Sequence, residues 1–244
     1  MFYHRMISLV ATLAVLFATT AATFATNTEN TKSDKKLARI LTPLNIAILI
    51  QDDLISQVGN ELDITRDFIR SLPAGSRVMV GYITSGSLQV RQPFTKDLDK
   101  AARSLRIPLS SRAASPFNPY VEVIEALRKF EVGWKGTNAV LLISDGLDTS
   151  RGFDSGAAGN TMDLHRAIKH ANERSVAVYS FYAPSVGLTS RSPIAASYGQ
   201  SSLNRLAQET GGKAFFQGST GFVSFDSHFR RLREALNAQY AMAN

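Results

Sequence analysis

The chain has 244 residues, no cysteine and a formal net charge of +7. The absence of cysteine excludes disulfide bonds and a lipid-anchored lipoprotein, so the fold must be held by its hydrophobic core, which a chain of this length can build. The Lys and Arg residues are scattered along the chain, which favours a solvated surface over a nucleic-acid groove.

The N-terminal 25 residues, "MFYHRMISLVATLAVLFATTAATFA", begin with a positive charge, continue with an apolar run and end in a small-x-small pattern. These features predict a signal peptide over residues 1–25 and a mature protein that is exported, either periplasmic or secreted, with no transmembrane segment after cleavage. An uncleaved N-terminal anchor stays open as an alternative. The polar residues 26–42 are predicted to form a tether, and residues 43–244 a single domain.

Strands and helices alternate along this domain. The first predicted strand, residues 44–50, is apolar on both faces, as a central parallel strand requires. A helix is predicted over 58–72 and a strand over 77–84, followed by a tight turn into an antiparallel strand, "LQVRQPF". The remaining predicted elements are helices over 96–105, 120–130, 161–173 and 201–210, a C-terminal helix, strands over 138–144, 175–182 and 213–217, and irregular loops over 107–119 and 192–202.

This order predicts an α/β fold with a doubly wound, mostly parallel sheet of six strands, one antiparallel edge strand and helices on both faces. Function in such sheets lies at the carboxyl ends of the strands. Two predicted strands run into acidic residues there, at Asp52 and Asp53 and again at Asp145. No glycine-rich turn follows the first strand, and no Gly-x-Ser-x-Gly pattern occurs, which argues against a dinucleotide site and a serine hydrolase.

Three stretches carry a resemblance to a known family: "ILIQDDLIS", "SLPAGSRVMVGYITSGSLQVRQPFTKDLDKAARSL" and "AVLLISDGLDTS". Together with the order of the elements, they make the chain resemble a von Willebrand factor type A domain over nearly all of residues 43–240. The blocks "RAASPF" and "LAQETGGKAFFQG" are similar to the exported bacterial branch that includes the acidobacterial von Willebrand factor type A-related proteins. The resemblance implies a Rossmann-like sheet with a metal-ion-dependent adhesion site.

In that family an Asp-x-Ser-x-Ser loop, a middle-loop Thr and a later Asp hold a divalent ion. The resemblance places Asp52 and Ser56 in the outer positions of the first loop, Ser115 in the middle loop and Asp145 in the last position. Leu54 stands where the first Ser is required. The implied site is therefore degenerate, and we expect it to bind Mg²⁺ or Mn²⁺ weakly or not at all.

The resulting prediction is an exported, non-enzymatic module for protein interaction or adhesion, with an unknown protein partner in the cell envelope and no catalytic residue or certain cofactor. One alternative is a metal-dependent hydrolase or phosphate-ester binder built on Asp52, Asp53 and Asp145. Another is a structural subunit of an envelope assembly. The predicted binding face consists of the loops 51–57, 110–119, 145–160 and 184–200.

Overall fold

The computed structural model describes most of the predicted domain. The described residues are 40, 42–131, 133–134, 136–153, 161–216 and 223–243. The predicted signal peptide lies outside them, as does the predicted tether except for residues 40 and 42. Residues 154–160 of the predicted binding face also lie outside.

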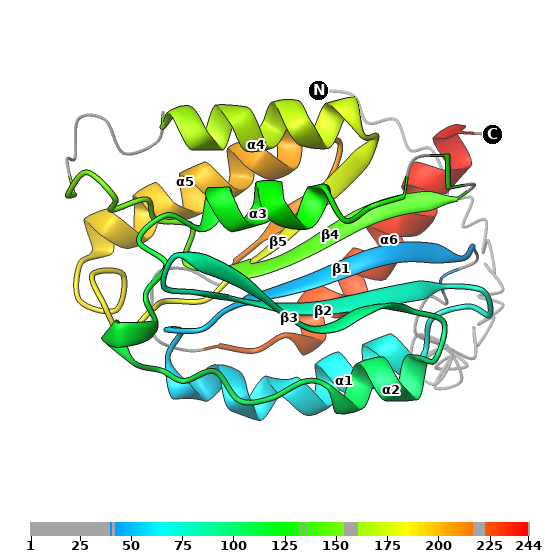
Figure 1. Cartoon of the computed structure of the whole chain (residues 1–244), viewed down its shortest axis with the longest axis horizontal. Coiled ribbons are helices and arrows are strands. Elements are labelled where there is room, and N and C mark those ends of the chain that lie inside the picture. The colour runs from blue at the N-terminus through cyan, green and yellow to red at the C-terminus, as the bar shows by residue number, and fades with distance from the viewer. Residues whose placement is uncertain are drawn as a thin grey trace, which may run out of the picture. The chain divides into compact units, whose positions relative to one another are not determined.

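A six-stranded sheet in the order β3-β2-β1-β4-β5-β6 forms the centre of the domain (Figure 1). All neighbouring strands are parallel except β3, which runs antiparallel to β2 at one edge. This arrangement confirms the predicted doubly wound α/β fold. The strands are β1 (Leu44–Gln51), β2 (Arg77–Thr84), β3 (Ser87–Thr95), β4 (Thr137–Ser144), β5 (Val176–Tyr182) and β6 (Ala214–Phe215).

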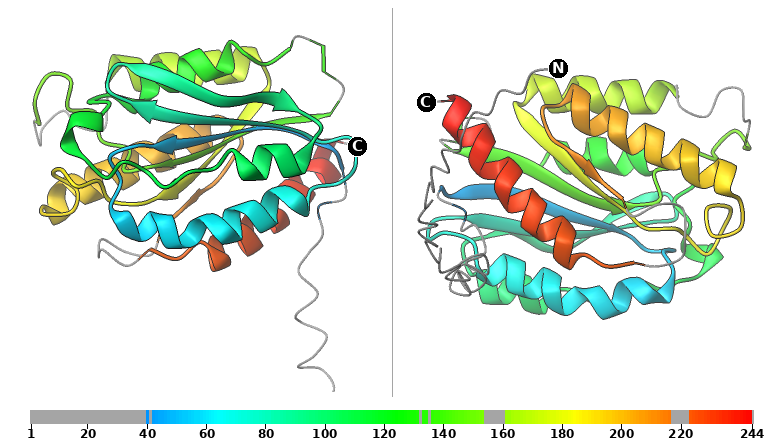
Figure 2. Two further views of the ribbon diagram at one scale, coloured as in Figure 1. Left: turned by 60° about the horizontal axis from the view of Figure 1, so that its bottom comes forward. Right: turned by 180° about the vertical axis from the view of Figure 1, so that it is seen from behind.

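Helices cover both faces of the sheet, as the two views of Figure 2 show. Because successive strand side chains point to opposite faces, neighbouring residues of β1 enter different cores: Ile48 packs in the core on one side and Leu49 in the core on the other. On the Ile48 side lie α1 (Leu62–Arg70), α2 (Leu98–Arg103) and α6 (Asp226–Ala243), and on the Leu49 side lie α3 (Pro119–Leu127), α4 (Met162–Glu173) and α5 (Pro193–Glu209).

The structure departs from the predicted elements in three places. The predicted loop 192–202 is mostly the first half of α5, because the Ser192 side chain accepts a hydrogen bond from the Ala195 N–H and a proline follows in the first helical turn. The last strand is limited to Ala214–Phe215. The predicted helix 58–72 begins as a 3₁₀ helix, η1 (Ser56–Glu61), and becomes α-helical at Leu62.

The carboxyl ends of β1, β2, β4 and β5 lie at one edge of the sheet, on the left in Figure 1. The chain also reaches this edge before α3, through a segment that contains a second 3₁₀ helix, η2 (Arg112–Ala114). The Ser110 N–H donates to the carbonyl oxygen of Asp52 at 2.9 Å, which fixes this segment beside the end of β1. We call this side of the sheet the carboxyl edge.

Candidate functional site

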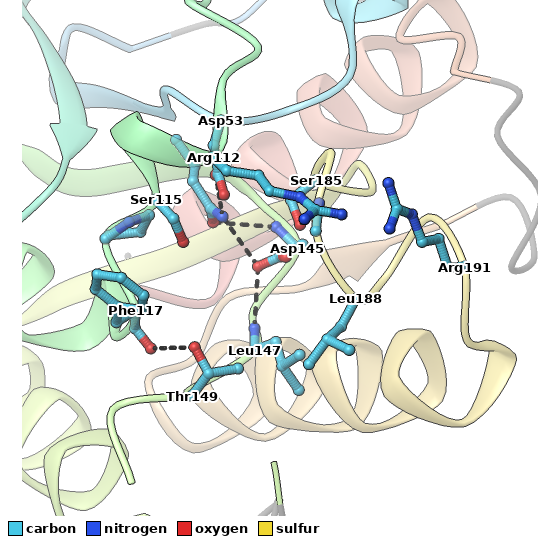
Figure 3. A pocket seen from close by; sticks show the side chains of 13 residues that line it. Asp53, Arg112, Ser115, Phe117, Asp145, Leu147, Thr149, Ser185, Leu188 and Arg191 are labelled. Atoms are coloured by element: carbon cyan, nitrogen blue, oxygen red, sulfur yellow. Dashed lines mark hydrogen bonds between the residues drawn. The ribbon is translucent and has the colours of Figure 1, made fainter. Parts of the chain in front are cut away.

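The ends of β1 and β4 bring one amide and two carboxylates together at the carboxyl edge. Gln51 is the last residue of β1, and its side-chain Nε2 donates to Asp53 Oδ1 at 2.7 Å and to Asp145 Oδ1 at 3.1 Å (Figure 3). All three side chains are buried. The amide of Gln51 therefore links the two carboxylates across two neighbouring strands.

The orientation of the Gln51 amide follows from its other contacts. Its Oε1 accepts from the backbone N–H of Asp145 at 3.3 Å and from Ser144 Oγ at 2.5 Å. A backbone N–H can only donate, so the amide oxygen must face it. The Gln51 NH₂ group consequently points at the carboxylates of Asp53 and Asp145.

Further donors engage Asp145. The Leu147 N–H donates to Oδ1 at 3.1 Å, and Thr189 Oγ1 donates to Oδ2 at 3.0 Å. Burial nevertheless raises the pKa of Asp145 above its usual range, against the opposing effect of these hydrogen bonds. Both oxygens of this carboxylate are thus engaged from within the protein.

Asp53 also departs from ordinary carboxyl behaviour. Burial first, and then the charge of Asp145, raise the pKa of Asp53 to about 6, while hydrogen bonds from Gln51 and Ser115 oppose the rise. Two carboxylates in one buried site repel each other unless a positive group or a proton separates them. Here the polar hydrogens of Gln51 partly fill that role.

A cavity of about 310 Å³ opens above these side chains (Figure 3). Its floor contains Asp53 and Asp145, and its wall contains Phe117, whose carbonyl oxygen accepts from the Thr149 N–H at 2.6 Å and so joins the two loops. The lining consists of Gln51, Asp53, Arg112, Ser115, Pro116, Phe117, Asp145, Leu147, Thr149, Ser185, Gly187, Leu188 and Arg191.

The structure brings two of the four predicted metal ligands, Ser115 and Asp145, to this cavity. Asp52 lies elsewhere: its side chain is fully buried, and its two carboxylate oxygens accept from Arg106 at 2.6 and 2.7 Å. Ser56 is exposed in η1. Leu54, which stands at a hydroxyl position of the family pattern, is buried in the core.

The metal prediction missed four residues of this site, which lie near Ser115 and Asp145. They are Gln51, Asp53, Ser185 and Thr189. The two-residue period of a strand was the signal that could have identified Gln51 and Asp53. Side chains two apart share a face, so Gln51 and Asp53 point to one side at the end of β1 while Asp52 points to the other. No comparable signal marks the loop that follows β5.

This arrangement does not fit the divalent cation that the resemblance implies. The Gln51 NH₂ group donates to both carboxylates, so the hydrogens of an amide lie where a cation would need free oxygens. Within the part of the chain that the structure describes, no group of three or more His, Cys, Asp or Glu side chains is placed to hold a metal.

Exposed apolar side chains gather around the same edge. Among the described residues, every exposed large apolar side chain lies in one of three kinds of segment. These are the loops that follow the carboxyl ends of strands, the segment that leads to α3, and the first turns of the helices that follow these loops and this segment. The side chains are those of Ile107, Leu109, Phe117, Val121, Met162, Leu188, Ile194 and Phe216. No such side chain is found at the opposite edge of the described sheet.

No protein-family model and no curated protein matches the chain. Solved structures match it throughout the domain. A conserved hypothetical protein, BatB from Bacteroides thetaiotaomicron, is 14% identical and covers 82% of this chain and 100% of its own, with a TM-score of 0.55. A von Willebrand factor type A protein from Catenulispora acidiphila is 17% identical, over 80% of this chain and 42% of its own, with a TM-score of 0.52.

An aerotolerance-related membrane protein from Bacteroides fragilis is 13% identical, over 80% of this chain and 99% of its own, with a TM-score of 0.50. At these identities the likeness concerns the fold. It places the chain among proteins with the von Willebrand factor type A-like fold, as the sequence resemblance predicted.

Proposed function

We propose that this chain, which has the von Willebrand factor type A-like fold, is an exported, non-enzymatic module that binds a protein partner in the cell envelope through its carboxyl edge. The observation that carries the proposal is the gathering of exposed apolar side chains at that edge. Exposed apolar side chains that gather at one edge of a domain are typical of sites that another molecule covers. The cavity above Asp145 lies at the same edge.

The cavity supports binding better than catalysis. Its described lining contains no histidine, lysine or cysteine. The oxygens of Asp145 are engaged by internal donors, and Asp53, whose pKa is raised to about 6, accepts a hydrogen bond from the Gln51 amide. Asp52, which the hydrolase alternative requires, is held in its ion pair with Arg106 away from the cavity. What the lining offers a ligand is shape, apolar contact and hydrogen bonds.

The export part of the proposal is supported by the predicted signal peptide and by the likeness to a protein described as an aerotolerance-related membrane protein. Among the described residues, no helix has the length and apolar character needed to cross a bilayer. The acidobacterial branch within the superfamily remains a prediction from the sequence.

The partner-binding role is tested by exchanging Phe117 and Leu188 for serine together. Both side chains are exposed, at 56% and 43%, so the double variant should keep the stability of the parent to within about 0.5 kcal/mol. We expect the affinity of the immobilised protein for the envelope partner to fall by about thirtyfold, because the two lost apolar side chains together remove about 2 kcal/mol of buried contact. Quantitative mass spectrometry of the captured proteins measures it.

Lys213→Ser is the control, since Lys213 is exposed and immediately precedes β6 at the opposite edge. This variant should capture the partner as the parent does. Equal recovery by the parent, the double variant and the control would show that the carboxyl edge is not the binding face.

We further propose that binding at this edge needs no cation. The melting temperature of the parent should be the same in excess Mg²⁺, excess Mn²⁺ or chelator, because ligand binding to the native state alone would raise it. Gln51→Glu removes the amide hydrogens and adds a third carboxylate beside Asp53 and Asp145. This variant should be less stable than the parent in chelator and should regain stability in Mg²⁺.

Calorimetric titration with Mg²⁺ and Mn²⁺ gives the direct measurement. Gln51→Ala is the matched variant, because it removes the same amide without adding a ligand and should gain no metal binding. Micromolar binding of Mg²⁺ by the parent would contradict the proposal and restore a metal-dependent adhesion site.

A further inference from the structure

Two arginines stand out because both line the same cavity and neither forms an ion pair with a described carboxylate. Arg112 comes from η2 and Arg191 from the segment between β5 and α5, yet both line the same cavity. Figure 3 shows both guanidinium groups on the side of the cavity where Ser185 lies. Both residues are exposed, and neither has a carboxylate within ion-pair distance among the described residues.

A neighbouring arginine shows the contrast. Arg106 lies six positions before Arg112. Its guanidinium group forms a bidentate ion pair with Asp52, and its Cζ atom lies 4.0 Å from the centre of the Tyr82 ring. Arg106 thus has a structural partner on the sheet. Arg112 and Arg191 have none, and their positive charges point into the same opening.

The acidic floor of the cavity does not supply the missing partner. Asp145 uses its oxygens for Gln51, Leu147 and Thr189, and Asp53 accepts from Gln51. Burial is the largest cause of the raised pKa of both carboxyls, and the hydrogen bonds that oppose it come from residues other than the two arginines. The guanidinium groups are therefore available to a group that enters from outside.

We propose that Arg112 and Arg191 form a carboxylate-binding site that recognises an aspartate or glutamate of the protein partner. Guanidinium groups bind carboxylates through paired, charge-assisted hydrogen bonds, and two such groups at one opening repel each other until an anion joins them. The net charge of +7 gives the whole chain the same preference for an acidic partner. This inference rests on the proposed binding role of the carboxyl edge.

The rim of the cavity adds a second requirement. Phe117 and Leu188 are exposed and line the same cavity as the two arginines, so the acidic residue that enters should have a bulky apolar neighbour. A cavity of about 310 Å³ accommodates one or two side chains but not a folded element. The geometry therefore points to a short acidic and apolar segment, such as a loop or a chain end of the partner.

The test uses the purified protein and two fluorescent hexapeptides, one with a glutamate next to a leucine and one with glutamine in place of that glutamate. By fluorescence anisotropy, the glutamate peptide should bind about tenfold more tightly, which corresponds to about 1.4 kcal/mol for a charge-assisted contact. Arg112→Gln and Arg191→Gln should each weaken it by about tenfold, leave the glutamine peptide unaffected and preserve the fold. Chelator should change nothing.

Arg103→Gln is the matched control, because it removes the same charge from an exposed position on α2. It should leave binding unchanged. Equal affinity for the two peptides, failure to bind the glutamate peptide, or an equal loss in Arg103→Gln would overturn the proposal. Displacement of the glutamate peptide by an equal concentration of inorganic phosphate would assign the site to free anions instead.

The two proposals can fail separately. If the Phe117 and Leu188 double variant loses the envelope partner while the arginine variants retain it, the carboxyl edge binds the partner without carboxylate recognition. If all of these variants retain the partner, the binding face lies elsewhere.

Discussion

Replacing Arg106 by alanine should lower the free energy of unfolding by about 3–5 kcal/mol, the usual cost of leaving a buried charge without its partner. The Asp52 side chain has no exposed surface, and Arg106 donates to both of its oxygens. Asp52 also accepts from the Leu109 N–H at 2.9 Å, so the loss extends to the segment that leads to the cavity. Equilibrium unfolding in urea measures the change.

Arg166→Ala provides the comparison. Arg166 pairs with Asp163 at 3.0 Å, but its side chain is 59% exposed, and exposed pairs contribute about 1 kcal/mol or less. A double variant with leucine at both 52 and 106 should be more stable than Arg106→Ala, because no charge remains buried. If Arg106→Ala unfolds at the same urea concentration as Arg166→Ala, the ion pair does not hold this edge together.

Truncation of the two central strands should cost about 2–5 kcal/mol per site, as large-to-small changes in cores do. Ile48 in β1 and Leu142 in β4 lie on adjacent parallel strands, and both are fully buried. They enter different cores, Ile48 beside the helices α1, α2 and α6 and Leu142 beside α3, α4 and α5. Ile48→Ala and Leu142→Ala should therefore each destabilise the domain by creating a cavity.

Because the two sites pack into different cores, their losses should add to within about 0.5 kcal/mol in the double variant. Val121→Ala is the control, since Val121 is 49% exposed and should change stability by less than about 0.5 kcal/mol. If either core variant unfolded at the same urea concentration as the parent, the truncated side chain would not contribute to the stability of the domain.

The fold could be predicted because its signals are local and repeated. Continuous apolar runs at 44–50 and 138–144 identify central parallel strands, and α1 and α4 each present a regular apolar face. The first half of α5 was missed because "SPIAASYGQSS" is rich in small and polar residues, which resemble a loop in composition. Packing against the sheet, not propensity, decides that segment.

The site was harder to predict because neighbouring residues at the end of β1 place their side chains in different surroundings. Asp52 and Asp53 are chemically identical, yet one lies in an ion pair with Arg106 and the other in the cavity. The partner of Asp52 is 54 positions away, and Thr189 reaches Asp145 from 44 positions away. Only the folded chain reveals such partners, whereas the end of β1 itself could be located from the sequence.

Helix α5 and the turn after it contact the backbone of two neighbouring segments, the loop after β4 and the strand β5. A Cβ atom on Gly199 would lie 1.9 Å from the Asp145 carbonyl oxygen, so the helix touches the backbone of the loop directly. At the carboxyl end of α5, the Thr210 hydroxyl accepts a hydrogen bond from the Val178 N–H at 3.0 Å. Shortly after it, a Cβ atom on Gly212 would lie 2.0 Å from the Val178 carbonyl oxygen. The helix is thus clamped at two points, one on the loop after β4 and one on β5. Because neither approach leaves room for a Cβ atom, a larger residue at Gly199 or Gly212 would push the chain away from the backbone that it contacts, and at Gly199 that backbone belongs to the floor of the cavity.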